Sequence, residues 1–227
     1  MSSLLICGDP HGQFQPILDR LAMDDVDGVI LLGDLELNAP LQQVFKDVIE
    51  RVAIYWVPGN HDTDSERVYD HLFGSELSQG NLHGKVTTIG KVRVAGLGGV
   101  FRGRVWDGFS NPVYASPSDF VAHCGKGNLW RGGLPLRHRS TIFPSDIAAL
   151  RGCKADVLVT HEAPSHHPLG NVALTEVASE LGASCAFHGH HHERREYPGG
   201  VWYGVGAADI LRLEIDEETS HVSVHWD

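Results

Sequence analysis

The sequence predicts an α/β protein with one mixed sheet or two packed sheets. Short apolar segments that do not alternate with polar residues recur along the chain, as expected for strands buried on both faces. Between the early strands, other segments carry apolar residues at three- and four-residue spacing, which is typical of amphipathic helices. Later, strands follow one another directly, and this change of rhythm favours a mixed sheet or two packed sheets.

The elements expected in the first half of the chain alternate between strand and helix. The expected strands are 4–9, 28–34, 52–60 and 92–99, and the expected helices are 14–23, 41–52 and 65–73. In the second half we expect a helix at 173–182, closed by Gly182, and strands at 155–162, 184–190, 201–207, 210–216 and 221–226. The last two strands alternate apolar and polar residues, as a half-exposed antiparallel strand does.

Residues 100–145 interrupt this rhythm. The segment is rich in glycine, proline, arginine and aromatic residues, so we expect a long, irregular, lid-like insertion. Its aromatic residues argue against full disorder. A length of 227 residues otherwise favours a single domain over residues 1–227.

Composition excludes several classes of partner and location. The formal net charge of −11 opposes long-range attraction to extended nucleic acid or to an anionic membrane. The N-terminus has no basic region typical of a signal peptide, and no apolar stretch approaches the roughly 20 residues that span a bilayer. The four cysteines form no C-x-x-C pair and suggest no disulfide framework. We therefore expect a cytoplasmic protein.

Polar residues follow five of the predicted strands. They are Asp9 and His11; Asp34; Asn60, His61 and Asp62; His161; and His190, His191 and His192. Ligands bind outside the carboxyl ends of the strands in open α/β sheets, so we expect these side chains to converge. Residues i and i+2 of an extended segment point the same way. Asp9 and His11 can therefore share one ion, as can His190 and His192, whereas His191 should point away.

The donor atoms of this set are carboxylate or amide oxygens and imidazole nitrogens, without a thiolate. Such a set suits Mn, Fe, Zn or Co and excludes a cysteine-type structural zinc. The seven residues expected to converge, Asp9, His11, Asp34, Asn60, His161, His190 and His192, are too many for one ion, whereas two ions that share a bridging carboxylate would use all seven. Taken singly, each motif also fits a capped turn or an exposed cluster; together they favour a metal centre.

The five motifs GDPHG, GD, GNHD, TH and GHHH resemble, in this order, the signature of the calcineurin-like metallophosphoesterase superfamily, from Asp9 to His192. The resemblance implies a four-layer α/β/β/α sandwich of two mixed sheets flanked by helices. It implies that one metal is held by Asp9, His11 and His192, the other by Asn60, His161 and His190, and both by Asp34. It also implies that His61 protonates the leaving group and that Asp62 holds the other ring nitrogen of His61.

The reaction implied by the resemblance is hydrolysis of a phosphate ester by a hydroxide bridging two divalent cations, with Mn expected first and Fe, Zn, Co or Ni as alternatives. We expect a phosphatase of phosphomonoesters, on protein or small molecules. A phosphodiesterase of nucleotides or cyclic nucleotides is the alternative, and a non-catalytic metal-binding scaffold a distant one. Leu35, Glu36 and Leu37 follow the GD motif where the phosphoprotein phosphatase branch has D-R-G, which leaves protein substrates open.

Other residues are weaker candidates. Guanidinium groups match phosphate geometry, so Arg102, Arg104, Arg137 and Arg139 are expected either to grip the substrate phosphate or to lie on a solvated loop. His188 and His191 are expected beside the site or at the surface. The sequence does not predict the oligomeric state.

Overall fold

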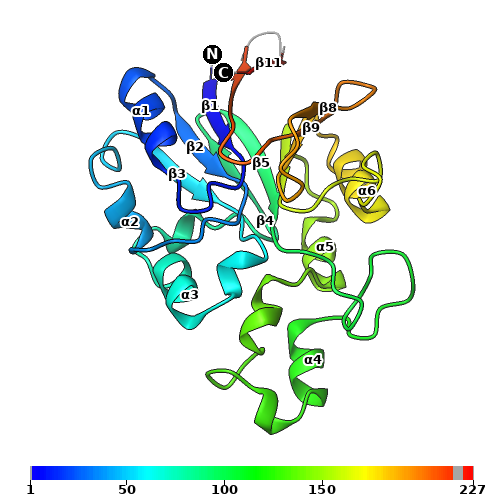
Figure 1. Ribbon diagram of the computed structural model, residues 1–227. Coiled ribbons are helices and arrows are strands. Elements are labelled where there is room, and N and C mark those ends of the chain that lie inside the picture. Colours follow the sequence, from blue (N-terminus) through cyan, green and yellow to red (C-terminus); the bar gives the residue numbers. More distant parts are fainter. Residues whose placement is uncertain (1, 217–221, 227) are drawn as a thin grey trace.

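The computed structural model describes residues 2–216 and 222–226, and it has the predicted α/β fold, with two mixed sheets flanked by helices (Figure 1). In the described residues the first sheet has the order β11-β10-β1-β2-β3. Its strands are β1 (Ser2–Cys7), β2 (Gly28–Leu31), β3 (Ala53–Trp56), β10 (Ile210–Ile215) and β11 (Val222–Trp226). β1, β2 and β3 are parallel, and β10 and β11 complete the sheet by antiparallel pairing. The segment predicted for β11 began at His221, which lies outside the described residues.

The second sheet has the order β4-β5-β6-β7-β9-β8. Its strands are β4 (Lys85–Ile89), β5 (Val92–Leu97), β6 (Val157–Thr160), β7 (Cys185–His188), β8 (Arg195–Glu196) and β9 (Trp202–Gly204). β5, β6, β7 and β9 are parallel, and the edge strands β4 and β8 are antiparallel to their neighbours. The parallel strands of both sheets supply the polar residues singled out above.

Helices cover the outer face of each sheet, so the layers follow the order helix, sheet, sheet, helix (Figure 1). The first sheet is covered by α1 (Gln15–Met23), α2 (Leu41–Val44) and α3 (Glu66–Phe73), and the second by α5 (Pro144–Leu150) and α6 (Val172–Leu181). None of the helices in the described residues is both long and apolar enough to cross a lipid bilayer.

β1 shows why the strand segments lack polar alternation. Leu5 packs with the helices outside the first sheet, whereas Leu4 and Ile6 belong to the core between the two sheets, because successive side chains of a strand point to opposite faces. Phe187 of β7 enters the same central core from the second sheet and is fully buried. Strands buried on both faces need apolar residues at every position.

Local signals fix several helix ends. The Ser65 side chain accepts a hydrogen bond from the Val68 amide and starts α3, and Gly182 ends α6 in the left-handed conformation at φ 71°. The helix predicted over 41–52 is only partly correct. It is α-helical over Leu41–Val44 and continues as hydrogen-bonded turns in which the amides of both Val48 and Ile49 donate to the Phe45 carbonyl.

The insertion is more ordered than the sequence predicts. It contains α4 (Pro117–His123), which the Ser116 side chain caps, and a small core of Val105, Phe120, Cys124 and Phe143. It projects beyond the sheets, away from the two termini (Figure 1). Within it, Trp130 donates through Nε1 to Glu66 Oε1 at 2.8 Å, which attaches the insertion to α3. The short elements α4, α5, β4 and β8 were not predicted.

Replacing Phe187 by alanine is expected to lower the free energy of unfolding by about 3–5 kcal/mol, because a fully buried aromatic ring leaves a cavity between the sheets. Denaturant unfolding would measure the loss. Phe109→Ala is the matched control, since Phe109 is 65% exposed and its removal should change stability by less than about 0.5 kcal/mol. Similar losses in both variants would contradict the central core described above.

Candidate metal centre

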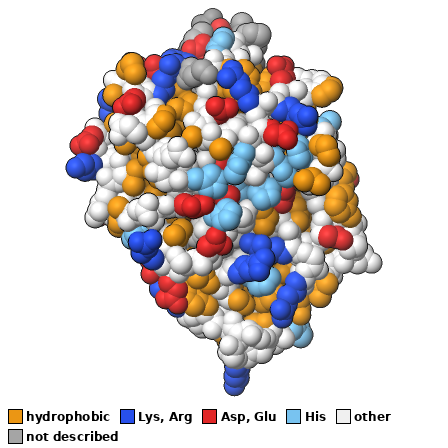
Figure 2. Space-filling view, in the orientation of Figure 1, with side chains coloured by type: hydrophobic (Ala, Val, Ile, Leu, Met, Phe, Trp, Pro, Cys, Tyr) orange, Lys and Arg blue, Asp and Glu red, His pale blue; other side chains and the backbone are white. Residues whose placement is uncertain are grey.

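Histidine and acidic side chains gather on one face of the molecule (Figure 2). The chain delivers them just beyond the carboxyl ends of parallel strands: Asp9 after β1, Asp34 after β2, Asn60 after β3, His161 after β6 and His190 after β7. These five strands lie in two different sheets. The convergence expected from the sequence is therefore produced by the packing of one sheet on the other.

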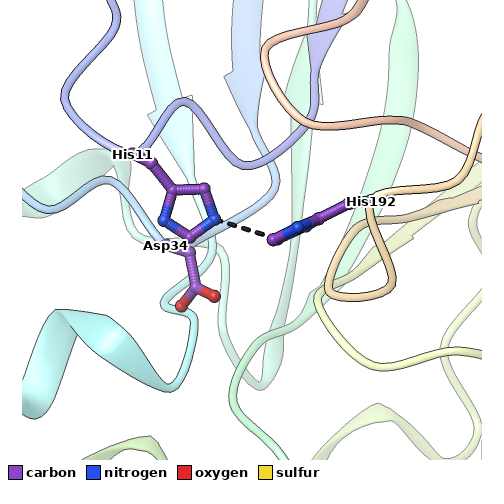
Figure 3. Close-up of side chains that lie close together, drawn as sticks. All are labelled: His11, Asp34 and His192. Carbon is purple, nitrogen blue, oxygen red and sulfur yellow. Dashed lines mark hydrogen bonds between the residues drawn. The ribbon is translucent and has the colours of Figure 1, made fainter.

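Two groups of possible ligands share one residue. In the first ligand group, His11, Asp34 and His192 each place a ligand atom within 4.8 Å of the others. The Nε2 atoms of His11 and His192 are 2.9 Å apart (Figure 3). The second ligand group consists of Asp34, His161 and His190, again within 4.8 Å. Asp34 belongs to both, as a carboxylate between two ions would.

Asn60 and Asp9 extend these groups. Asn60 Oδ1 lies 3.2 Å from Nε2 of His161, whose Nδ1 is 2.8 Å from the Leu32 carbonyl. Asp9 is fully buried, and its Oδ2 accepts a hydrogen bond from the His190 amide at 2.6 Å. Its Oδ1 is buried without a hydrogen-bond partner. A buried, unpartnered carboxylate oxygen is costly, and a cation is the partner that its charge requires, so these residues fit a metal.

Backbone strain is concentrated at the same residues. Asp9, His11, Asp34, His190 and His192 have φ values of 23°, 42°, 49°, 70° and 56°. Positive φ is uncommon for residues with a side chain, and such strain clusters at functional sites. Five of the seven residues expected to bind metal therefore occupy a backbone conformation that local interactions alone disfavour.

Two glycines leave the room that the carboxylates need. A Cβ atom at Gly59 would lie 2.2 Å from Asp34 Oδ1, and one at Gly189 would lie 2.4 Å from Asp9 Oδ1. Real Cβ atoms do not approach other atoms so closely. The glycines of the GNHD and GHHH motifs therefore let backbone pack directly against the two carboxylates.

Burial shifts the pKa values of the acidic and histidine residues in the centre. Burial, followed by the charge of Asp34, raises the pKa of Asp9 well above its usual value. Burial lowers the pKa of His161, and it lowers that of His190 to about 3. The two imidazoles are thus neutral at neutral pH, as metal ligands must be. The crowded carboxylates repel one another, and a cation would relieve that repulsion.

The structure corrects the role expected for Asp62. Nδ1 of His61 lies 2.6 Å from Asp64 Oδ2, so Asp64, not Asp62, holds the ring. Asp62 is fully buried and accepts hydrogen bonds from the amides of Leu35 and Gly59, both at 2.8 Å. It therefore joins the loops that follow β2 and β3. The three-residue spacing of His61 and Asp64 within one helical turn was the signal that sequence reasoning missed.

Asp64 also contributes to the raised pKa of His61. Burial opposes protonation of the ring, but the hydrogen bond to Asp64 and the charges of Asp34 and Asp64 outweigh it and raise the pKa of His61. A raised pKa favours the protonated imidazole, which can act as an acid.

Glu162 and Glu36 are further residues that the sequence analysis did not select. Glu162 Oε1 lies 3.8 Å from His190 Nε2 and 3.9 Å from His191 Nε2, and burial raises the pKa of Glu162 to about 7. His191 thus turns toward Glu162 and stacks on His167 with ring centroids 3.8 Å apart. Glu36 Oε1 lies 2.7 Å from Nδ1 of His11, which orients the His11 ring. Each glutamate follows a strand-end motif, but its partners become adjacent only in the fold.

The four candidate arginines separate into different environments. Arg102 is half-buried, hydrogen-bonds Thr141 and Ser140, and lies within the electrostatic influence of Asp34 and Glu162. Arg139 instead packs against Tyr69 and Trp130, 5.5 and 4.9 Å from their ring centres. It therefore attaches the insertion to α3. Arg104 and Arg137 line a pocket of the insertion.

The chain is similar to known proteins along most of its length. The model of the calcineurin-like phosphoesterase family matches residues 2–194. An uncharacterized protein of Haemophilus influenzae is 40% identical over 203 residues, covering 86% of this chain and 87% of that protein. The crystal structure of TT1561 of Thermus thermophilus superposes with a TM-score of 0.61 at 14% identity, covering 99% of this chain and 98% of that one. The last likeness concerns the fold alone.

Divalent-cation affinity is expected to fall as the pH is lowered from about 8 to about 5, because a bound cation requires ionised Asp9. The raised pKa of Asp9 brings proton competition closer to neutrality than at an ordinary carboxyl group. Below that pKa, the dissociation constant for Mn²⁺ should rise about tenfold per pH unit as one proton is displaced. Calorimetric titration would measure it. Asp9→Asn should flatten the dependence, and equal affinity across this range would contradict the assignment.

Proposed function

Because this chain belongs to the calcineurin-like phosphoesterase family and is a hydrolase of phosphate esters, we propose that it hydrolyses phosphomonoesters with two divalent cations held around Asp34. The observation that carries the proposal is that Asp34 belongs to both the first and the second ligand group. A carboxylate shared in this way can hold two ions side by side while each ion keeps its own histidines.

The residues assigned to the two ions follow the two ligand groups. His11 and His192, with Asp9, would hold one ion, and Asn60, His161 and His190 the other. When bound, the cations would lower the pKa of a water molecule and screen the negative charge of the phosphoryl group. The mixed oxygen and nitrogen donors favour Mn²⁺, with Fe, Zn, Co or Ni as alternatives.

His61 is the proposed proton donor to the leaving oxygen. Its Nδ1 is engaged by Asp64, so its Nε2 carries the proton available for transfer. The raised pKa of His61 favours the protonated ring, which can donate this proton. A weakly acidic alcohol leaves poorly as an alkoxide, and protonation removes this difficulty.

Arg102 supports the choice of monoesters. Its Nε and Nη2 donate to Thr141 and Ser140, and these bonds hold a cationic fork beside the acidic centre. A monoester carries a second phosphoryl charge that a diester lacks, and a guanidinium group can bind it bidentately.

Net charge and cysteine content bear on the substrate and on the cellular compartment. We propose a phosphorylated small molecule or protein as the partner, rather than extended nucleic acid, because the net charge is −11. The cytoplasm remains the proposed compartment, supported by four cysteines that are all free.

Asp34→Asn is expected to lower Mn²⁺-dependent hydrolysis of 4-nitrophenyl phosphate by about 10³-fold or more, because both ions lose their shared ligand. Initial rates with and without chelator would measure this. Asp19→Asn, an exposed carboxylate on α1, is the control and should keep the wild-type rate. Activity that survives both Asp34→Asn and chelation would exclude the proposed centre. A higher kcat/KM for bis(4-nitrophenyl) phosphate than for the monoester would favour the diesterase.

His61→Asn should slow hydrolysis of an alkyl phosphate by about 10²- to 10⁴-fold, since that leaving group needs the proton. Hydrolysis of 4-nitrophenyl phosphate should slow far less, because nitrophenolate leaves without protonation. Asp64→Asn should show the same pattern more weakly, whereas Asp62→Asn should mainly lower the melting temperature. Equal losses on both substrates in His61→Asn would remove His61 from the acid role.

A further inference from the structure

The insertion contains a basic pocket beside the metal centre. The pocket measures about 210 Å³, and the side chains that line it include Arg104, Asn128, Arg137 and His138. All of these residues belong to the insertion. Figure 2 shows lysine or arginine side chains gathered next to the histidine-rich area, on the same face of the molecule.

In the described part of the chain, ion pairs do not neutralise the arginines around this pocket. Within residues 2–216 and 222–226, no carboxylate lies within ion-pair distance of Arg102, Arg104 or Arg137. By contrast, Arg131 of the same insertion pairs with Asp70 and Glu66. The charge of Arg137 also acts on Arg102 and lowers its pKa, after burial. Arg102 and Arg137 repel each other, and all three arginines act on His138. On a protein of net charge −11, this concentration of positive charge indicates a site for an anion.

The pocket has a rigid base. Phe120 is almost fully buried; the Arg104 guanidinium lies 5.9 Å from its ring centre, and the His138 ring lies 4.5 Å from it. Burial, followed by the charges of Arg102, Arg104 and Arg137, lowers the pKa of His138 to about 4. His138 is therefore a neutral hydrogen-bonding group among three cations, and the Phe120 ring lies beside both His138 and Arg104.

A chain of hydrogen bonds connects this pocket to the metal centre. Nδ1 of His138 and Nε of Arg102 lie 3.2 and 3.0 Å from the same hydroxyl group, that of Thr141. Arg102 also donates to the Ser140 hydroxyl at 3.3 Å, and Ser140 in turn lies 2.7 Å from the Thr63 hydroxyl. Thr63 is in the same 3₁₀ turn as His61, His61–Thr63. Arg102 thus stands between the reacting centre and the pocket.

We propose that the basic pocket binds a second phosphoryl group of the substrate, so that the preferred substrate is a small molecule with at least two phosphoryl groups. One group would lie at the metal centre and be hydrolysed, and the other would lie between Arg104 and Arg137. The inference rests on the proposed phosphomonoesterase function and specifies its substrate class. Guanidinium groups suit a phosphoryl dianion because they bind it with paired hydrogen bonds.

The first experiment compares inhibitors that differ only by one phosphoryl group. Inhibition of 4-nitrophenyl phosphate hydrolysis by the Mn²⁺-loaded enzyme would be measured with two pairs: fructose 1,6-bisphosphate against fructose 6-phosphate, and adenosine 3′,5′-bisphosphate against adenosine 5′-monophosphate. In the wild type at least one bisphosphate should bind about tenfold more tightly than its partner, and this ratio should fall to about one in R104Q/R137Q. R131Q, on the same insertion, is the control and should keep the wild-type ratio.

The second experiment is independent of catalysis. Pyrophosphate would be titrated calorimetrically into the full chain in chelator at low ionic strength, where the uncompensated carboxylates of the metal centre repel anions. Binding to the wild type and to R131Q, weakened about tenfold or more in R104Q/R137Q, would support the pocket even if no ester were hydrolysed. Absence of binding, or equal binding to all three proteins, would overturn the proposal. Pyrophosphate binding without any bisphosphate preference would overturn the assignment to the substrate and identify free pyrophosphate as a ligand of the pocket.

Discussion

The mutual repulsion of buried carboxylates is the constraint around which this molecule is organised. Asp9, Asp34 and Asp62 are all essentially fully buried, and the charge of Asp34 acts on the pKa of both others. Burial of several acids in one place is unfavourable unless cations or hydrogen bonds compensate for it. Asp62 obtains backbone hydrogen bonds, whereas Asp9 retains an oxygen without a partner. The neutral histidines, held by the strained loops, complete a set of ligands suited to cations.

The two-sheet fold makes this concentration possible. β1 and β2 of one sheet and β6 and β7 of the other end at the same place, so each loop contributes one or two ligands and then leaves the site. Apolar side chains fill the space between the sheets below. The backbone at Asp9, Asp34 and His190 is strained. Burial of apolar side chains in a core that extends through both sheets offsets the unfavourable energy of this strain.

The sequence predicted the parts of the molecule that depend on short-range patterns. The strands around β1 and β7 follow from unbroken apolar runs, and the convergence of Asp34 with His190 follows from the position of ligands at strand ends. The expected pairing of His61 with Asp62 was wrong, because His61 pairs with Asp64 instead, and choosing between two nearby acids requires the geometry of the turn. The contact of Glu162 with His191 depends on how two loops cross, and no periodicity records it. The insertion was read as irregular because its small core joins residues far apart in sequence, such as Val105 and Phe143.

The hydroxyl contact between Thr63 and Ser140 has a consequence for protein engineering. It is buried and joins the turn that carries His61 to the segment that carries Arg102, so these two regions form one mechanical unit. A chimaera that receives the insertion of a relative without a hydroxyl at the position of Ser140 would lose this buried contact and leave the Thr63 hydroxyl with only the Asn60 carbonyl, 3.3 Å away, as a partner. Grafts intended to change specificity should therefore transfer the turn and the insertion together.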